Sequence, residues 1–193
     1  VTYSISERGS DWRKIIVMDT ISKEIKEDTI IDVKFSGMSW QGNEGFYYSS
    51  YEKPKGSELS AKTDQHRLFY HKIGTKQADD IIIFGDKEKR RYVGGYVTED
   101  NKYLIVSAAT STSGNELYFK DLSNSKNPVK PIILGFDFDT YVLDHRDENL
   151  YLVTNLEAPN KWIVKVNVHN PESKNWVDVI SETDNVLAVS EIT

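Results

Sequence analysis

The sequence predicts an all-β fold whose strands are grouped in fours. Helical periodicity is scarce, and short runs rich in Val, Ile, Tyr and Phe recur between polar turns. Most connections are short, which favours antiparallel hairpins, because parallel strands need a crossover of a dozen or more residues. The runs predicted as strands are Tyr3–Ser6, Lys14–Asp19, Phe46–Tyr51, Leu68–Ile73, Ile81–Phe84, Tyr103–Ala108, Leu117–Leu122, Tyr141–Asp144, Leu150–Thr154, Trp162–Val168 and Trp176–Ile180.

The strands also repeat along the chain. Apolar residues at the centre of each third strand are 53, 49 and 45 residues apart, namely Val17, Tyr70, Phe119 and Val164. Those of each fourth strand are 52, 50 and 45 residues apart, namely Ile30, Ile82, Ile132 and Val177. A third set, spaced by 57 and 46 residues, is Trp40, Val97 and Leu143. Four strands per repeat of this length indicate β-propeller blades. A β-sandwich has no reason to repeat every fourth strand.

We therefore expect residues 1–193 to form a partial β-propeller of about four blades. The expected divisions are an incomplete blade at 1–33, complete blades at 34–84, 91–134 and 139–180, and the first strand of a next blade at 185–193. An open arc of blades leaves two blade faces uncovered, because each blade is buried against its neighbours. We thus expect a piece of a larger propeller that self-associates through its exposed blade faces.

Composition excludes several classes of function. The formal net charge is −6, from 24 Lys and Arg against 30 Asp and Glu, which argues against a nucleic-acid partner. The absence of cysteine excludes disulfides, thiol catalysis and Cys-ligated metals. The apolar runs are too short to span a membrane, and no signal peptide opens the sequence. Both the cytoplasm and the periplasm are compatible with this composition, so localisation stays open.

The residues that could carry chemistry form no recognisable catalytic set. The spacing of His66 and His71 puts them on opposite faces of a strand, so they cannot form a shared metal site by themselves, and His145 and His169 lie at turns. Asp137 and its neighbours lack the pattern of a calcium loop. Neither a Gly-x-Ser-x-Gly elbow nor a phosphate-binding glycine loop occurs. We expect no metal site and no cofactor.

Seven stretches in order along the chain resemble one family closely. They are Gly9–Trp12, Val33–Trp40, Gly45–Tyr51, His66–Gln77 with Asp80, Val97–Leu104, Asn115–Leu122, and Thr154-Asn155 with Ala158–Asn160. Each is weak alone, but together they cover the whole chain. They resemble the propeller of the prolyl oligopeptidases, the prolyl endopeptidase family of serine peptidases.

The resemblance implies a seven-bladed propeller that caps an α/β-hydrolase domain with a Ser-Asp-His triad. This chain matches only the middle blades, and the hydrolase domain is absent from it. We therefore expect the parent protein to be a serine-type prolyl endopeptidase that cleaves short proline-containing peptides after proline. The propeller segment would gate substrate access to the hydrolase domain of the same parent chain. Without nucleophile, base and oxyanion donors, the segment itself is expected to be non-catalytic.

The resemblance also implies two substrate contacts. Phe35 matches a position that lines an apolar subsite upstream of the proline, and Tyr92 falls where a second lining residue is found. From the residues alone, Phe35 could equally be an aromatic packed inside a blade. In the family an arginine that holds the substrate backbone often follows the strand matched by Tyr103–Ser107. Its place is taken here by Ala109, which puts a direct arginine contact from this blade in question.

A second class of function stays open at this stage. Propellers host many unrelated activities, so the fold alone is also compatible with a free-standing scaffold for protein–protein interaction. A hydrolase segment downstream in the parent reading frame would favour the peptidase, and further propeller repeats would favour the scaffold.

Overall fold

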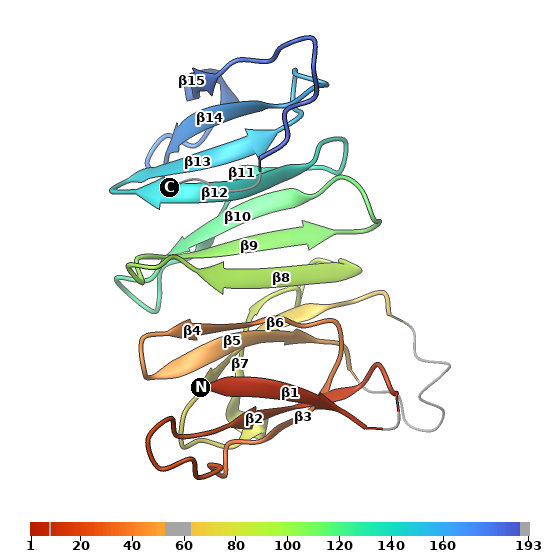
Figure 1. Cartoon of the computed structure of the whole chain (residues 1–193), viewed down its shortest axis with the longest axis vertical. Coiled ribbons are helices and arrows are strands. Elements are labelled where there is room, and N and C mark those ends of the chain that lie inside the picture. The colour runs from red at the N-terminus through yellow and green to blue at the C-terminus, as the bar shows by residue number, and fades with distance from the viewer. Residues whose placement is uncertain (8, 53–62, 190–193) are drawn as a thin grey trace. The chain divides into compact units, whose positions relative to one another are not determined.

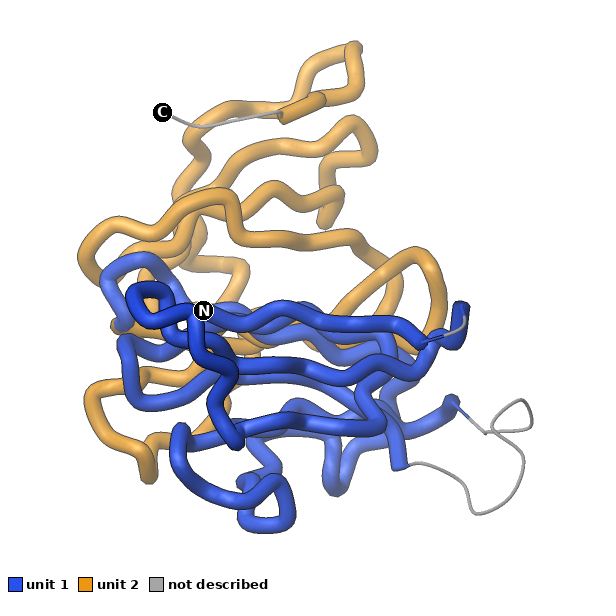
Figure 2. The backbone as a smooth tube through the Cα atoms, turned by 60° about the horizontal axis from the view of Figure 1, so that its bottom comes forward, with its two compact units in different colours: residues 1–101 blue, residues 102–193 orange. Residues whose placement is uncertain are grey.

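The computed structural model describes residues 1–7, 9–52 and 63–189. Their regular structure consists of β-strands and two short 3₁₀ helices, η2 (Gln77–Asp79) and η3 (Ser173–Asn175). The chain divides into two compact units, residues Val1–Asn101 and Lys102–Thr193 (Figure 2). Each unit is described by itself.

The first unit contains a three-stranded sheet, a four-stranded sheet and one further strand (Figure 1). The first sheet has the order β1-β2-β3, and its strands are β1 (Thr2–Ser6), β2 (Arg13–Val17) and β3 (Ile30–Val33). The second has the order β4-β5-β6-β7, and its strands are β4 (Met38–Gln41), β5 (Gly45–Ser50), β6 (Arg67–Lys72) and β7 (Ile81–Phe84). The further strand is β8 (Tyr92–Val97).

The second unit contains three strands of a third sheet and all four strands of a fourth. The third sheet has the order β11-β10-β9-β8, and its remaining strands are β9 (Tyr103–Ala109), β10 (Glu116–Asp121) and β11 (Val129–Ile133). The fourth has the order β12-β13-β14-β15, and its strands are β12 (Thr140–Arg146), β13 (Asn149–Thr154), β14 (Trp162–Asn167) and β15 (Val177–Ile180). The paired strands within both units are antiparallel.

Each unit has its own apolar core. In the first unit the core joins the inward residues of β2 and β3 to Phe46 and Tyr48 of β5. All six residues of β5 are buried, as expected for a strand covered on both faces. In the second unit the core runs through β9, β10, β13 and β14, where Leu150, Leu152 and Val164 are fully buried. Aliphatic and aromatic residues on neighbouring strands thus make up both cores.

The predicted fold class is confirmed: consecutive antiparallel strands form sheets of four, except for a first sheet of three, and helix is almost absent. Each predicted strand matches an observed strand to within two residues at either end. Strands β3, β4, β8 and β11 were represented in the sequence only by single repeat markers. For the strand expected at 185–193, residues 185–189 are described and form no strand, and residues 190–193 lie outside the described residues.

Candidate functional site

A cluster of three aromatic residues lies in the first unit. Phe35 follows β3, Tyr51 directly follows β5, and Tyr92 opens β8. The centroid of the Phe35 ring lies 6.3 Å from that of Tyr51, edge-on, and 6.3 Å from that of Tyr92. These separations are typical of attractive aromatic pairs. The two residues singled out for an apolar subsite, Phe35 and Tyr92, are therefore neighbours in space.

Phe35 is exposed and conformationally strained. The residue is 52% exposed, so it does not pack in the core. Its φ is 54°, in the left-handed region that bulky residues rarely adopt and that costs about 1 kcal/mol or more. A strained aromatic residue that is left open to solvent is typical of a contact site rather than of a core.

Two cations stand beside the aromatic rings. The Lys34 Nζ lies 5.1 Å from the centroid of the Phe35 ring and 3.3 Å from Asp11 Oδ2, so its charge is partly balanced. The Arg91 guanidinium carbon lies 5.4 Å from the centroid of the Tyr92 ring. Both are cation–π contacts, in which the positive charge is attracted to the negative face of the ring. The cluster therefore combines an apolar surface with a positively charged border.

The hydroxyl of Tyr51 anchors this cluster. Burial raises the pKa of Tyr51 to about 12, and the Tyr92 hydroxyl adds to this shift while the charge of Arg91 opposes it. Tyr51 thus keeps its proton and donates a hydrogen bond to the carbonyl oxygen of Arg91, at 2.5 Å. Only 5% of Tyr51 is exposed, so it supports the cluster from below.

His66 lies under Tyr51, and its contacts determine its tautomer. Its ring stacks on that of Tyr51 with centroids 4.2 Å apart. Nδ1 accepts a hydrogen bond from the backbone N–H of Val93 at 2.9 Å, so the ring proton is on Nε2, which donates to the carbonyl oxygen of Lys34 at 3.0 Å. Burial lowers the pKa of His66 to about 4, although the bond to Lys34 opposes this shift. The ring is therefore neutral at physiological pH.

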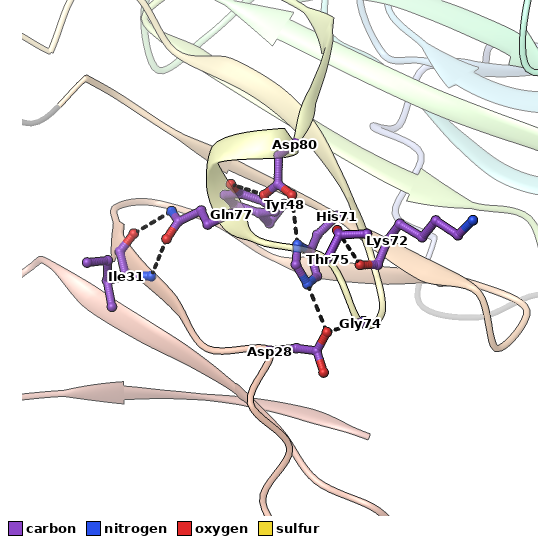
Figure 3. A network of polar contacts seen from close by, with 9 residues as sticks. All are labelled: Asp28, Ile31, Tyr48, His71, Lys72, Gly74, Thr75, Gln77 and Asp80. Atoms are coloured by element: carbon purple, nitrogen blue, oxygen red, sulfur yellow. Dashed lines mark hydrogen bonds and ion pairs between the residues drawn. The ribbon is translucent and has the colours of Figure 1, made fainter.

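His71 belongs to a separate polar network of the first unit (Figure 3). Its Nδ1 lies 2.7 Å from Asp80 Oδ1, and its Nε2 lies 3.5 Å from Asp28 Oδ1, an ion-pair distance longer than a good hydrogen bond. The Tyr48 hydroxyl donates to the second oxygen of Asp80 at 2.7 Å, and Asp28 also accepts from the Gly74 backbone N–H. His71 is fully buried, so its two carboxylates are its main polar surroundings.

These carboxylates determine the charge of His71. Burial lowers the pKa of His71, but the hydrogen bond and charge of Asp80, reinforced by Asp28, raise it more, so that the pKa lies above its ordinary value of 6.5.

Close by, the Gln77 side chain exchanges two hydrogen bonds with the backbone of Ile31, at 3.0 and 2.9 Å (Figure 3). The network thus ties the loop before β7 to the first sheet, which is a structural role.

The other residues considered from sequence lie apart from the cluster. His145 is in the second unit, where its Nε2 lies 3.1 Å from the carbonyl oxygen of Asp147. His169 is exposed and lies 3.3 Å from Glu148. Ala109 ends β9 and carries only a methyl group, so it supplies no cation. Over the residues that the structure describes, no group of His, Asp and Glu side chains is arranged to hold a metal ion.

Sequence reasoning did not assign Tyr51 and His66 to the site. Both lie inside stretches that resemble the family, but their role depends on how β5 and β6 pair with each other and on how β8 packs against them. Ser50 is paired with Arg67 in the β5–β6 ladder, which brings Tyr51 and His66 together at one end of the sheet. Such a juxtaposition has no signature in the linear sequence.

Comparison with known proteins identifies the family of this chain. The family model described as "Prolyl oligopeptidase, N-terminal beta-propeller domain" matches residues 1–193. The chain belongs to the prolyl oligopeptidase family. It is 55% identical over 192 residues to a prolyl endopeptidase of Elizabethkingia meningoseptica and 54% identical to one of Elizabethkingia miricola, covering 98% of this chain in each case. It spans 27% of the length of either relative.

Solved structures of prolyl oligopeptidases share the fold. One, from a study of two prolyl endopeptidases and their inter-domain dynamics, is 25% identical with a TM-score of 0.87 over 99% of this chain and 27% of its own. Another is prolyl oligopeptidase B from Galerina marginata bound to a 35mer hydrolysis and macrocyclization substrate, 25% identical with a TM-score of 0.80 over 98% of this chain and 28% of its own. The predicted family is therefore confirmed.

A search of the described residues for a helix with the length and apolar character of a membrane span finds none.

Proposed function

We propose that this chain is the substrate-gating propeller segment of a prolyl oligopeptidase-type serine endopeptidase that cleaves short peptides after proline. The observation that carries the proposal is the 55% identity, over 98% of the chain, to a prolyl endopeptidase. Catalysis belongs to an α/β-hydrolase domain of the parent chain, and this segment contributes none of the triad. Its partners are that domain and the short proline-containing peptides that enter between the two.

The aromatic cluster is the part of this segment that contacts substrate in our proposal. Phe35 and Tyr92 form the wall of an apolar subsite upstream of the proline, supported by Tyr51. The exposure of Phe35 leaves its ring free to pack on an apolar side chain, and fully burying such a side chain contributes about 1.5–3 kcal/mol. A propeller cap would further exclude water and folded chains from the catalytic centre, which strengthens the electrostatic contribution of the triad.

The test uses the full-length protein that contains this chain. We expect it to cleave a chromogenic peptide after proline, to lose this activity with a serine-directed inhibitor, and to leave a folded protein with exposed prolines intact. Cleavage after residues other than proline would contradict the specificity. Cleavage of the folded protein would contradict the gating role.

The scaffold alternative predicts a different result. A full-length protein without a hydrolase segment would hydrolyse no peptide and would not react with the serine-directed inhibitor. The names of the relatives favour the peptidase, since both are prolyl endopeptidases at more than half identity. No feature of the described residues favours a scaffold over a peptidase.

A further inference from the structure

His66 contacts the two backbone segments that carry the exposed aromatic rings. Its Nε2 donates to the carbonyl oxygen of Lys34, the residue directly before Phe35, at 3.0 Å. Its Nδ1 accepts from the backbone N–H of Val93, the residue directly after Tyr92, at 2.9 Å. Since the two segments are far apart in sequence, one imidazole ring joins them.

The backbone of His66 holds the second segment as well. The backbone N–H of His66 donates to the carbonyl oxygen of Arg90 at 2.7 Å. The hydroxyl of Tyr51 donates to the carbonyl oxygen of Arg91 at 2.5 Å. The residues on both sides of Tyr92 are thus fixed by His66 and by the ring stacked upon it. Tyr92 has little freedom to move without breaking one of these bonds.

The first segment needs such support because Phe35 is strained. Its positive φ of 54° disfavours the observed backbone, and its half-exposed ring gains little from core packing. The bond from His66 to the Lys34 carbonyl fixes the peptide group that precedes this strained residue. His66 is 1% exposed, so water does not compete for the two hydrogen bonds of its ring.

We propose that His66 is a positioning residue of the apolar subsite, because its ring holds Phe35 and Tyr92 at the separation that accepts an apolar side chain upstream of the proline. The inference rests on the proposed function of the aromatic cluster and adds the residue that sets its geometry. His66 itself touches no substrate: Tyr51 covers its ring.

Three substitutions separate the two bonds. His66→Phe keeps a flat ring on Tyr51 and removes both bonds. His66→Asn places an amide oxygen near the position of Nδ1 and retains the bond to Val93, whereas His66→Gln reaches the position of Nε2 and retains the bond to Lys34. The two amides leave a single bond unmade, so folded protein is available even where His66→Phe is poorly stable.

The readout is substrate preference in the full-length enzyme. Two peptides differ only upstream of the proline, with phenylalanine in one and glycine in the other, and the ratio of their kcat/KM values measures the subsite. We expect His66→Phe to lower this ratio about fivefold, through KM of the phenylalanine peptide, and each amide variant to lower it less. A ratio that stays at the wild-type value in all three His66 variants overturns the proposal. An equal loss of kcat/KM for both peptides overturns it as well.

His71→Gln is the matched control, since His71 is as buried as His66 but contacts neither Phe35 nor Tyr92. It should lower stability and leave the ratio unchanged; a ratio lowered as much as in His66→Phe shows a general loss of rigidity and overturns the proposal.

Phe35→Ala tests the subsite itself. If Phe35→Ala leaves the ratio unchanged, the proposed subsite is refuted and this inference with it. If Phe35→Ala lowers the ratio and the His66 variants do not, only the role of His66 is refuted.

Discussion

His66 and His71 lie five residues apart, and their surroundings shift their pKa values in opposite directions. Around His66 the ring partners are a backbone N–H and a backbone carbonyl, so burial dominates and lowers the pKa to about 4. Around His71, Asp80 and Asp28 outweigh burial and raise the pKa. The pattern of the strand predicted that the two rings diverge, but not which partners each would meet, because those partners come from loops distant in sequence.

The ion pair of His71 should make local stability depend on pH. A raised pKa in the folded state means that the stabilisation is fully present below the unfolded value of 6.5 and is lost as the pH rises through the folded value. Asp80→Asn removes the charge that raises the pKa of His71 while keeping an oxygen for the Tyr48 hydroxyl. We expect this variant to be less stable than wild type by about 1–3 kcal/mol near pH 6 and less so at higher pH.

Hydrogen exchange of the segment around Gly74, expressed as protection factors from pH 6 to 9, measures this effect, because the Gly74 N–H is bonded to Asp28 in the same network. Asp79→Asn is the control, as it removes a neighbouring exposed carboxylate that has no contact with His71. A constant difference between wild type and Asp80→Asn over the whole pH range would contradict a charged His71.

At the scale of elements, the sequence predicts strands best where apolar residues are dense. Runs such as Tyr103–Ala109 of β9 and Ile81–Phe84 of β7 are unmistakable. Strand β8 is less visible, because two glycines interrupt it, and β11 contains Pro131, which cannot donate to a ladder. Strand β3 contains Asp32 at a φ of 58°, so its irregular backbone hides it from a search for alternation.

Some residues of the candidate site could likewise be predicted from the sequence, and others could not. Resemblance to the family identified Phe35 and Tyr92, and the structure brings the two rings together. Tyr51 and His66 were not identified, since a stacked pair that joins the ends of two strands leaves no periodic signal. Loop geometry and pairing register, rather than composition, therefore decide which polar residues lie beside the aromatic cluster.

The loop between β9 and β10 depends on one glycine. Gly114 has a φ of 71°, and a Cβ at this position would lie 1.7 Å from the carbonyl oxygen of Phe136, in backbone that cannot easily move. Gly135 in the facing loop is the matched control, because its φ is 94° but a Cβ there would meet nothing within 4 Å. We expect Gly135→Ala to cost about 1 kcal/mol and Gly114→Ala about 3 kcal/mol or more.

The midpoint of thermal unfolding of the full-length protein, followed for both variants, measures this contrast. Equal shifts for Gly114→Ala and Gly135→Ala would show that the backbone angle alone decides, and that the contact with Phe136 has no further effect.

At the scale of the whole chain, β15 presents an edge at which a second copy of the chain could pair. It pairs only with β14 in the order of its sheet, and all four of its residues are exposed. Val177, Val179 and Ile180 are between 46% and 50% exposed, which is unusual for three apolar residues on one short strand. A strand edge that is free among the described residues, and apolar, is a template for pairing with a second chain.

We therefore expect the 193-residue chain, expressed alone, to form dimers or larger species as its concentration rises. Val179→Lys should shift this equilibrium toward the monomer, because a charge on an edge strand must be desolvated when another strand pairs with it. Val186→Lys is the control, since Val186 is 66% exposed but lies outside any strand. Sedimentation velocity over a range of concentrations measures the distribution. A chain that stays monomeric throughout would show that the edge of β15 does not pair, and equal effects of the two lysines would assign any association to general apolar exposure instead of strand pairing.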